Sequence, residues 1–373
     1  MCLVDVAINM AEELDYASSG VDIDLEGNAV SALVSALSKS VRKPGTKGAP
    51  VDLPGGFGGL IEFGDNYLAL ATDGVGSKLS IASKLNQWHG VGIDCMAMNV
   101  NDLLCVGAEP IAFVDYIAVP KPDPDIHEAI GQSLAEACKR ARVTLAGGET
   151  ASLPGIVTEL DLSGTALGWL PKGAEITGVN LKEGDLLIGL PSGGVHSNGY
   201  SLIRNVVSHC GADWNDPAPF EVDERRIERF SDGKITLGEI FLNPTRIYCD
   251  PIVDLIQNGP CDSSAIHAIC HITGGGLSNL LRLHDSLGWH IENPLPVLPE
   301  FNWIQQNGNV NDREMYRTFN MGCGMIIAVD SQKAELVCEW LSSRLEGCKI
   351  IGEVVNNGHK VTHTNPDVSF EHY

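Results

Sequence analysis

Basic residues are scarce in this chain of 373 residues, where 25 Lys and Arg face 48 Asp and Glu and the formal net charge is −23. A nucleic-acid-binding protein normally carries a basic face, so this balance argues against that class. Long hydrophobic runs are also missing, since none approaches the roughly 18 apolar residues of a membrane-spanning helix. The first residues, Met1 to Asp5, lack the basic-then-apolar order of a signal peptide. We therefore expect a cytoplasmic protein that contacts neither nucleic acid nor membrane.

Several common motifs are absent as well. No P-loop occurs and no GxGxxG follows a strand, which disfavours Walker-type NTPases and Rossmann dehydrogenases. The 11 cysteines include no CxxC pair and are too sparse for a disulfide scaffold, so we expect reduced core thiols. One group suggests a zinc site, but its spacing fits no zinc pattern and residues 265–270 alternate like a strand: Cys261, His267, Cys270 and His271. The pattern favours a structural role for this group.

The overall composition is that of a globular protein, and its glycine content predicts loops with a function. Hydrophobic residues make up 44% of the chain and charged residues 20%, so a sizeable core is expected. At roughly 150 residues per domain the length favours two domains. A polar connection over residues 171–185 predicts the boundary between residues 1–170 and 171–373. The 41 glycines predict many positions that need positive φ or close approach to a ligand.

The first half contains two glycine-rich segments, at residues 54–59 and 72–78. Residues 54–59 contain four glycines, Gly55, Gly56, Gly58 and Gly59, and form either a flexible linker or a loop whose amides fold over phosphate. A strand over 67–71 then runs into a turn that carries Asp73, Gly74, Gly76 and Lys78. An acid, two glycines and a lysine at a strand end are typical of a metal and phosphate site.

A helix is predicted over residues 91–106, closed by Gly107 and Pro110. One side of it carries Asp94, Met98, Asn101, Asp102 and Cys105, because steps of three, four and eight stay near one face. The helix has no Lys or Arg, so a metal or nucleotide site competes with a merely solvated face. A long helix over 123–142 and a strand over 143–146 follow, and a tight turn is predicted to carry Gly147, Gly148, Glu149 and Thr150. Carboxylates from several such ends, brought together, would hold Mg²⁺ between triphosphate oxygens.

The second half restarts with a strand over 186–190, followed by a glycine turn and a helix that ends near residue 209. The turn contains His196 and Ser197, and a helix start of this kind offers backbone donors to an anion. His196 is either a structural histidine or the titratable group of a site. A similar turn, Thr273 to Gly276, precedes a predicted helix over 277–286 and invites the same phosphate interpretation. Strand, helix (332–345) and strand end a mixed α/β layer domain.

The order of these segments strongly resembles the aminoimidazole ribonucleotide synthetase family, also named phosphoribosylformylglycinamidine cyclo-ligase, of de novo purine synthesis. The resemblance spans nearly the whole chain and rests on residues 20–24, 72–78, 92–94, 101–103, 147–150, 196–201, 244–248, 271–276, 301–303 and 314–320. The segments at 72–78, 101–102 and 147–150 alone would indicate only the wider superfamily, which includes selenophosphate synthetase, formylglycinamidine synthetase and thiamine-monophosphate kinase.

The resemblance implies a two-domain α+β subunit. Its N-terminal mixed sheet would combine with that of a second copy into a β-barrel, which makes a homodimer, and ATP would lie in a cleft near it. The reaction would be ATP-dependent ring closure of formylglycinamidine ribonucleotide to aminoimidazole ribonucleotide. The γ-phosphoryl group would go to the formyl oxygen, and the amidine nitrogen would then attack the formyl carbon.

The resemblance also implies site residues. Asp73, Asp102 and Glu149 would hold Mg²⁺, with Asp94 beside them, and Lys78, His196 and Asp102 would be the catalytic residues. The nucleotide would be bound by the same acids and Lys78 together with Gly55, Gly56, Gly58, Gly59, Gly74, Gly76, Gly147, Gly148 and Thr150. The substrate would be bound by His196, Ser197, Asn198, Thr273, Gly274, Gly275, Gly276 and Asn320.

The chain departs from bacterial members at two places. Tyr16 is followed by Ala17 and two serines where Lys-Asp-Ala is usual, and Ser35 stands where many have a lysine near the nucleotide. Lys39, one helical turn further on, is the obvious substitute. Two other functions stay open: a small-molecule kinase of the superfamily, which leaves phosphate on its substrate, and a non-catalytic nucleotide-binding subunit. The carboxylates at the turns argue against the second.

Overall fold

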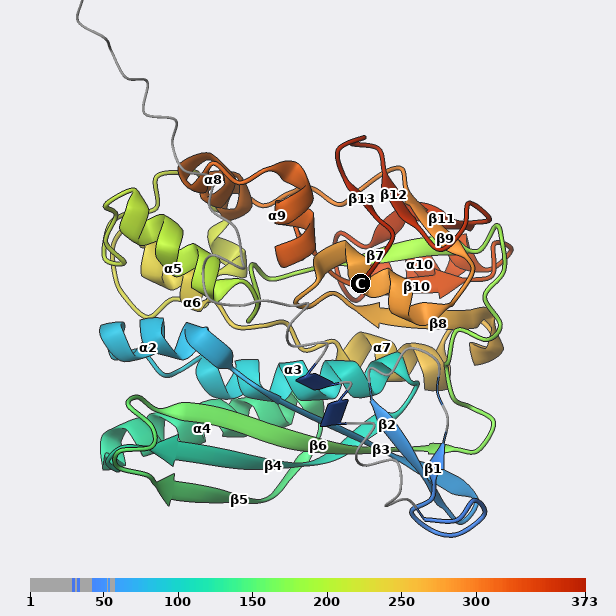
Figure 1. The fold of residues 1–373 in the computed structure, drawn as a ribbon, viewed down its shortest axis with the longest axis horizontal. Helices are drawn as coiled ribbons and strands as arrows, with labels where there is room; N and C mark the ends of the chain where they lie inside the picture. Colours follow the sequence, from blue (N-terminus) through green and yellow to red (C-terminus); the bar gives the residue numbers. More distant parts are fainter. Residues whose placement is uncertain (1–28, 31, 34–41, 52, 54–57) are drawn as a thin grey trace, which may run out of the picture.

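The computed structural model describes residues 29, 30, 32, 33, 42–51, 53 and 58–373. These residues form two separate β-sheets with helices between and around them (Figure 1). All strands of one sheet precede residue 172, and all strands of the other follow residue 185. The chain is therefore an α+β protein with two sheet-based halves, as expected. No helix among these residues is long and apolar enough to cross a membrane.

The N-terminal sheet has six strands in a mixed arrangement. Its spatial order is β1 (Pro50–Val51), β2 (Gly59–Phe63), β3 (Asn66–Gly74), β6 (Asp161–Pro171), β4 (Glu109–Val119) and β5 (Thr144–Ser152). Only the β4–β5 pair is parallel. The sequence predicted a tight turn at residues 147–150, and that prediction is wrong because these residues continue β5 in register with β4.

Helices cover one face of this sheet. They are α2 (Leu79–Leu85), which follows the 3₁₀ turn η1 (Gly76–Lys78), α3 (Val91–Cys105) and α4 (Pro124–Ala141). Asp123 caps α4 by accepting from the amides of Asp125 and Ile126, and Pro124 occupies its first turn. Gly92 is needed where α3 and α4 cross, since a Cβ there would lie within 3 Å of Ser133 and Leu134. The Ser133 hydroxyl accepts the Gly92 amide across that crossing.

The C-terminal sheet has seven strands. Its order is β13 (Ser369–Phe370), β12 (Val361–His363), β9 (Gly288–Ile291), β11 (Lys349–Val355), β7 (Leu186–Pro191), β10 (Cys323–Val329) and β8 (Ile266–His271). The helices and 3₁₀ turns of this half are α5 (Tyr200–His209), η2 (Glu224–Arg226), α6 (Leu237–Leu242), α7 (Cys249–Asn258), η3 (Ser263–Ala265), η4 (Gly276–Leu283), α8 (Pro299–Gly308), α9 (Asp312–Thr318) and α10 (Ala334–Ser342).

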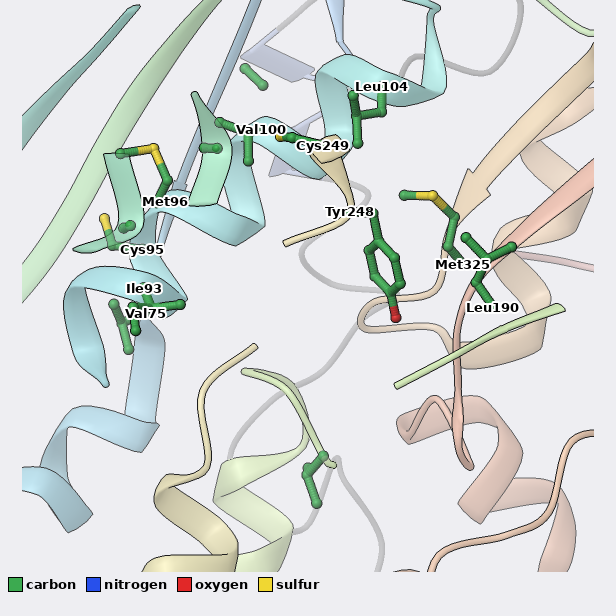
Figure 2. Close-up of a cluster of buried hydrophobic side chains, with 14 of the residues drawn as sticks. Val75, Ile93, Cys95, Met96, Val100, Leu104, Leu190, Tyr248, Cys249 and Met325 are labelled. Atoms are coloured by element: carbon green, nitrogen blue, oxygen red, sulfur yellow. The ribbon is translucent and has the colours of Figure 1, made fainter. Parts of the chain in front are cut away.

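Helix α3 lies between the N-terminal sheet and the C-terminal half (Figure 1). Every residue of α3 except Asp102 is buried, which explains why the helix contains no Lys or Arg. The solvated face that the sequence left open is therefore excluded. One hydrophobic cluster runs across the junction of the two halves, and Tyr248 lies in it close to Leu190 and Met325 (Figure 2).

The prediction of reduced core thiols is confirmed for six cysteines and is wrong for the exposed Cys210. Ten free cysteines occur among the described residues, and six are buried: Cys95, Cys105, Cys249, Cys270, Cys323 and Cys348. Burial raises the pKa of each of these thiols. His267 and Cys270 belong to β8 and point to opposite faces of it, so the zinc grouping is not formed.

Candidate active site at the domain interface

Lys78 is fully buried at the junction of the two halves. Its ammonium donates to the Asp94 carboxylate at 2.9 Å and to the carbonyl oxygens of His196 at 3.2 Å and Asn243 at 2.8 Å. Burial lowers the pKa of Lys78, and the charge of Asp94 opposes that shift. These three acceptors use all three N–H donors of the ammonium. A phosphate contact by Lys78 would require one of these bonds to be exchanged.

Asp94 completes this interdomain contact. Its Oδ1 accepts from the amide of Thr245 at 2.7 Å and from the Thr245 hydroxyl at 2.6 Å, besides its ion pair with Lys78. The residue is fully buried. Asp94 and Lys78 therefore tie η1 and α3 of the N-terminal half to the segment after α6.

Asp102, near the end of α3, forms a second interdomain pair. Its Oδ1 lies 2.8 Å from Nδ1 of His271, the last residue of β8. The His271 ring is fully buried, whereas Asp102 is partly exposed. Asn101 supports the pair, because its side chain contacts His271 and accepts from the Tyr248 amide at 3.0 Å. The imidazole of His271 is thereby held against Oδ1 of Asp102, and Oδ2 of Asp102 stays available to a ligand.

Asp73 is the second-to-last residue of β3, and the charges of Asp102 and His271 act on its carboxylate. Desolvation by the surrounding protein raises the pKa of Asp73 to about 6, and the negative charge of Asp102 adds to that shift. The Gly74 amide and His271 act in the opposite direction. By surface area Asp73 is nevertheless an exposed residue. Asp73 and Asp102 thus act on each other electrostatically, but the ligand atoms of Asp73, Asp102 and His271 do not all lie within 4.8 Å of one another.

Glu149, the third predicted metal ligand, lies elsewhere. In the sheet the level of Asp73 continues through Gly164 and Asp115 to Gly148, so three strand spacings separate β3 from β5. That corresponds to about 14 Å. Gly148 shares the helix-covered face with Asp115, so its neighbour Glu149 projects from the opposite face. Within one chain the predicted set Asp73, Asp102 and Glu149 does not converge on one ion.

Asp115 is a carboxylate of β4 that the sequence analysis did not single out. It lies on the helix-covered face of β4, separated from Asp73 only by Gly164 of β6. Burial raises the pKa of Asp115. A Cβ at Gly148 would overlap the Asp115 carboxylate, which explains one glycine of the 147–150 segment. Thr150 lies on this same face and Gly147 borders open space.

His196 lies in the turn after β7 with a φ of 66°, a conformation that side chains other than glycine rarely adopt. Its Nε2 accepts the Gly193 amide at 3.3 Å, which places the ring proton on Nδ1. Nδ1 is buried and has no partner. Burial moves the pKa of His196 well below its usual value, so the ring is neutral. A buried N–H donor without an acceptor is suited to a ligand oxygen.

A hydrogen-bond network fixes this turn. The Gly193 carbonyl accepts from Asn243 at 2.7 Å and from Arg226 at 3.2 Å. Arg226 forms a bidentate pair with the buried Glu300. Asn320, predicted to contact substrate, instead donates to the carbonyls of Gly194 at 2.9 Å and Val195 at 3.2 Å. Its side-chain amide thus holds the turn that carries His196.

The two predicted anion turns of the C-terminal half are neighbours. A Cβ at Gly274 would lie 3.3 Å from Oδ1 of Asn198, and the Ser197 hydroxyl bonds that of Thr245 at 3.0 Å. Gly275 and Gly276 have φ values of 102° and 54°. A side chain at Gly276 would strike the Tyr316 carbonyl, so the turn is tightly packed on one side. Thr273 and Gly274 remain partly exposed beside Asn198.

The glycine segment is described only in part. Gly55 and Gly56 lie outside the described residues, as do Ser35, Lys39 and the segment 20–24. Gly58 is described, and its Cβ position would lie 3.8 Å from the Asp102 carbonyl oxygen. Gly59 begins β2. Gly76 has a φ of 72° and opens η1, whereas Gly74 ends β3. The described end of the glycine segment is therefore adjacent to the carboxylate site.

Sequence reasoning missed most residues that support the site from the second half. The sequence analysis assigned no role in this site to five residues, although segments 244–248 and 271–276 carried part of the resemblance: Asn243, Thr245, His271, Arg226 and Glu300. Each is buried or half-buried. Asn243, Thr245 and His271 bond residues that the sequence did single out, whereas Arg226 and Glu300 bond each other. Their spacing along the chain gives no periodic signal, because the contacts form only when the halves pack.

Two family models match the chain. Residues 56–170 match "AIR synthase related protein, N-terminal domain", and residues 182–364 match "AIR synthase related protein, C-terminal domain". Phosphoribosylformylglycinamidine cyclo-ligase of Methanococcoides burtonii is 43% identical over 94% of this chain and 97% of its own length. The enzyme of the same name from Methanobrevibacter smithii is 42% identical over 93% and 96%.

Solved structures with lower sequence identity share the fold. "AaThiL complexed with AMPPCP and TMP" superposes with a TM-score of 0.60 at 14% identity, covering 95% of this chain and 99% of that one. "Crystal Structure of Hydrogenase Maturation Protein HypE in complex with ATP" gives 0.57 at 16% identity, covering 90% and 93%.

Proposed function

We propose how the site of this chain closes the imidazole ring of aminoimidazole ribonucleotide. The chain belongs to the AIR synthase family, in which the phosphoribosylformylglycinamidine cyclo-ligases are its relatives. The chain is an ATP-dependent ligase of purine biosynthesis that closes the imidazole ring of aminoimidazole ribonucleotide. The observation that carries the assignment of the site is the pair of Asp102 and His271 at the junction of the halves, whose charges act on Asp73. His196 lies in the adjoining buried network.

The chemistry defines what the site must do. A formamide oxygen is a poor leaving group, so the γ-phosphoryl of ATP is transferred to it and ADP leaves. The amidine nitrogen then attacks the former formyl carbon, the C–O bond breaks, and phosphate departs with the oxygen. Because both partners are in one molecule, effective molarity favours ring closure. The enzyme positions the reactants, neutralises charge and moves a proton.

The described acids fit a magnesium ion. Asp73 and Asp102 offer hard oxygen ligands, and their mutual repulsion contributes to the raised pKa of Asp73. A dication held by Asp73 and Asp102 would offset that repulsion and would supply positive charge to the phosphates of ATP. An acidic protein can thus hold an anionic nucleotide. Two structural neighbours are complexes with ATP or AMPPCP, which supports placing the nucleotide here.

His196 is proposed to donate from Nδ1 to the formyl oxygen. The neutral ring suits that role, since the proton sits on the unpartnered nitrogen. Asn198, Ser197 and the turn from Thr273 to Gly276 are proposed to bind the remainder of the substrate and its ribose phosphate. Asn320 is proposed to act by holding the His196 turn.

The division of labour between the halves is also proposed. Residues 1–170 would bind ATP and pair with a second copy, and residues 171–373 would bind the ribonucleotide. The face of the N-terminal sheet away from the helices supports the pairing, because it leaves apolar side chains exposed: Leu70, Val114 and Tyr116. In such a homodimer Glu149 would face the interface.

The decisive experiment supplies purified protein with Mg-ATP and formylglycinamidine ribonucleotide and follows the aromatic amine product together with free phosphate. The cyclo-ligase yields both in equal amounts with ADP. A small-molecule kinase yields ADP and a phosphorylated substrate without free phosphate, and that outcome would overturn the assignment. Asp102→Asn should lower turnover at saturating Mg²⁺, and His196→Ala should lower the rate of ring closure. His209→Gln, at an exposed site, is the control.

A further inference from the structure

A second group of potential metal ligands lies at the far end of the C-terminal sheet. Asp185 precedes β7, His267 is the second residue of β8, and Asp330 follows β10. Since β10 lies between β7 and β8 and is antiparallel to both, the ends that carry these residues meet. One ligand atom from each residue lies within 4.8 Å of the other two. Among the described residues no other such group of three occurs.

The Asp185 carboxylate supplies an independent sign that a cation belongs here. The side chain has 0% exposure. Its Oδ2 accepts the Lys182 amide at 2.9 Å and lies 2.6 Å from Nδ1 of His267. Its Oδ1 is buried and has no partner. A buried carboxylate oxygen without a donor is costly, and a metal ion is one way to satisfy it.

We propose that Asp185, His267 and Asp330 bind a divalent transition-metal ion of the Zn²⁺ or Co²⁺ type. One imidazole nitrogen with two carboxylates suits borderline metals, whereas Mg²⁺ and Ca²⁺ take oxygen ligands. The site is separate from the catalytic residues, because His267 lies four residues from His271 along β8, about 13 Å.

Lys182 pairs with the Asp330 carboxylate that the metal would bind. Its ammonium lies 2.5 Å from Oδ2 of Asp330, and its side chain is 57% exposed. An exposed lysine can swing into solvent when a dication binds the same carboxylate. The ammonium and the metal therefore compete for Asp330, and removal of the lysine should favour the metal.

The bound ion would join three strands of the C-terminal sheet. Because a ligand that binds only the folded chain stabilises it, Zn²⁺ should raise the melting temperature. The ion touches no residue of the proposed reaction, so its effect should appear in stability and leave turnover of the ligase unchanged. Failure of the metal proposal thus leaves the proposed reaction standing, and the reverse also holds.

The test is calorimetric titration of the full chain with Zn²⁺ or Co²⁺ in excess Mg²⁺, which occupies sites made only of oxygen. The wild type should bind one ion that His267→Gln and Asp185→Asn bind at least about tenfold more weakly. Lys182→Met should bind it more tightly. His209→Gln, an exposed histidine outside the group, should behave as wild type.

Two results would overturn the site. Equal stoichiometry and affinity in the wild type and His267→Gln would show that the ion binds elsewhere. Unchanged affinity in Lys182→Met would remove Asp330 from the ligand set. Should Asp185→Asn fail to fold, His267→Gln still decides, because glutamine keeps a hydrogen-bonding group at this position while removing the imidazole ligand. A Zn²⁺-dependent rise in melting temperature must likewise be lost in His267→Gln.

Discussion

Asp73 shows how neighbours tune a single group. Its pKa of about 6 exceeds the ordinary value of 3.8, so the folded chain holds a proton that the unfolded chain releases between these values. Stability from this residue is therefore greatest at low pH and is lost as the pH rises toward 6. Above pH 6 the carboxylate is charged, and desolvation and the negative charge of Asp102 then destabilise the folded chain.

Asp73→Asn should consequently stabilise the metal-free chain at pH 7.5 and have little effect at pH 4.5. The amide keeps the shape and removes the charge that burial disfavours. Thermal denaturation of both proteins at the two pH values checks this. A shift of equal size at both would mean that the charge is not the cause.

Lys78 and Asp94 illustrate a different single-residue effect, that of a buried ion pair. Lys78→Met should destabilise the chain by about 3–5 kcal/mol, because it leaves the Asp94 carboxylate buried without its cation. The double variant Lys78→Met with Asp94→Leu should lose less than the sum of the single losses. Urea denaturation gives the three free energies. Additive losses would show that the two residues act independently.

At the scale of an element, strand β5 depends on a close contact with the neighbouring strand β4. Gly148→Ala should cost about 1–3 kcal/mol, since the added methyl would overlap the Asp115 carboxylate. Gly147→Ala, one residue away, meets no atom within 4 Å and provides a matched control. Denaturation of both variants measures the difference. A Gly148→Ala chain as stable as Gly147→Ala would show that Asp115 moves freely.

Elements with strong local signals could be predicted from the sequence. The helix at 124–141 has its cap, its first-turn proline and its basic end, and the strand and turn around 186–199 were also found. The turn at 147–150 was predicted wrongly, because paired glycines usually break a strand and the reason for them, Asp115 on β4, is a long-range contact. For the same reason the sequence indicated Asp73 and Asp102 but not their partner His271. Glu149 was grouped with them because local sequence does not reveal which sheet face a side chain takes.

At the scale of the whole molecule, the proposed pairing of two chains depends on the open face of the N-terminal sheet. Val114→Glu should shift the protein from dimer to monomer in size-exclusion chromatography, because a charge replaces an apolar contact. Leu336→Glu on α10, at a residue that is 44% exposed, should leave the assembly unchanged. Since each copy carries a net charge of −23, added salt should strengthen the pairing. A monomer in the wild type would contradict the proposal.

The buried thiols have a practical consequence for anyone who studies this protein. Cys210 is exposed and should react at once with a maleimide, whereas the six buried cysteines should react only when the chain opens. Because those six are shared between α3 in one half and β8, β10 and their neighbours in the other, the order in which they become labelled would report which half loosens first. The chain thus carries its own set of labelling sites for following partial unfolding, and no cysteine has to be introduced.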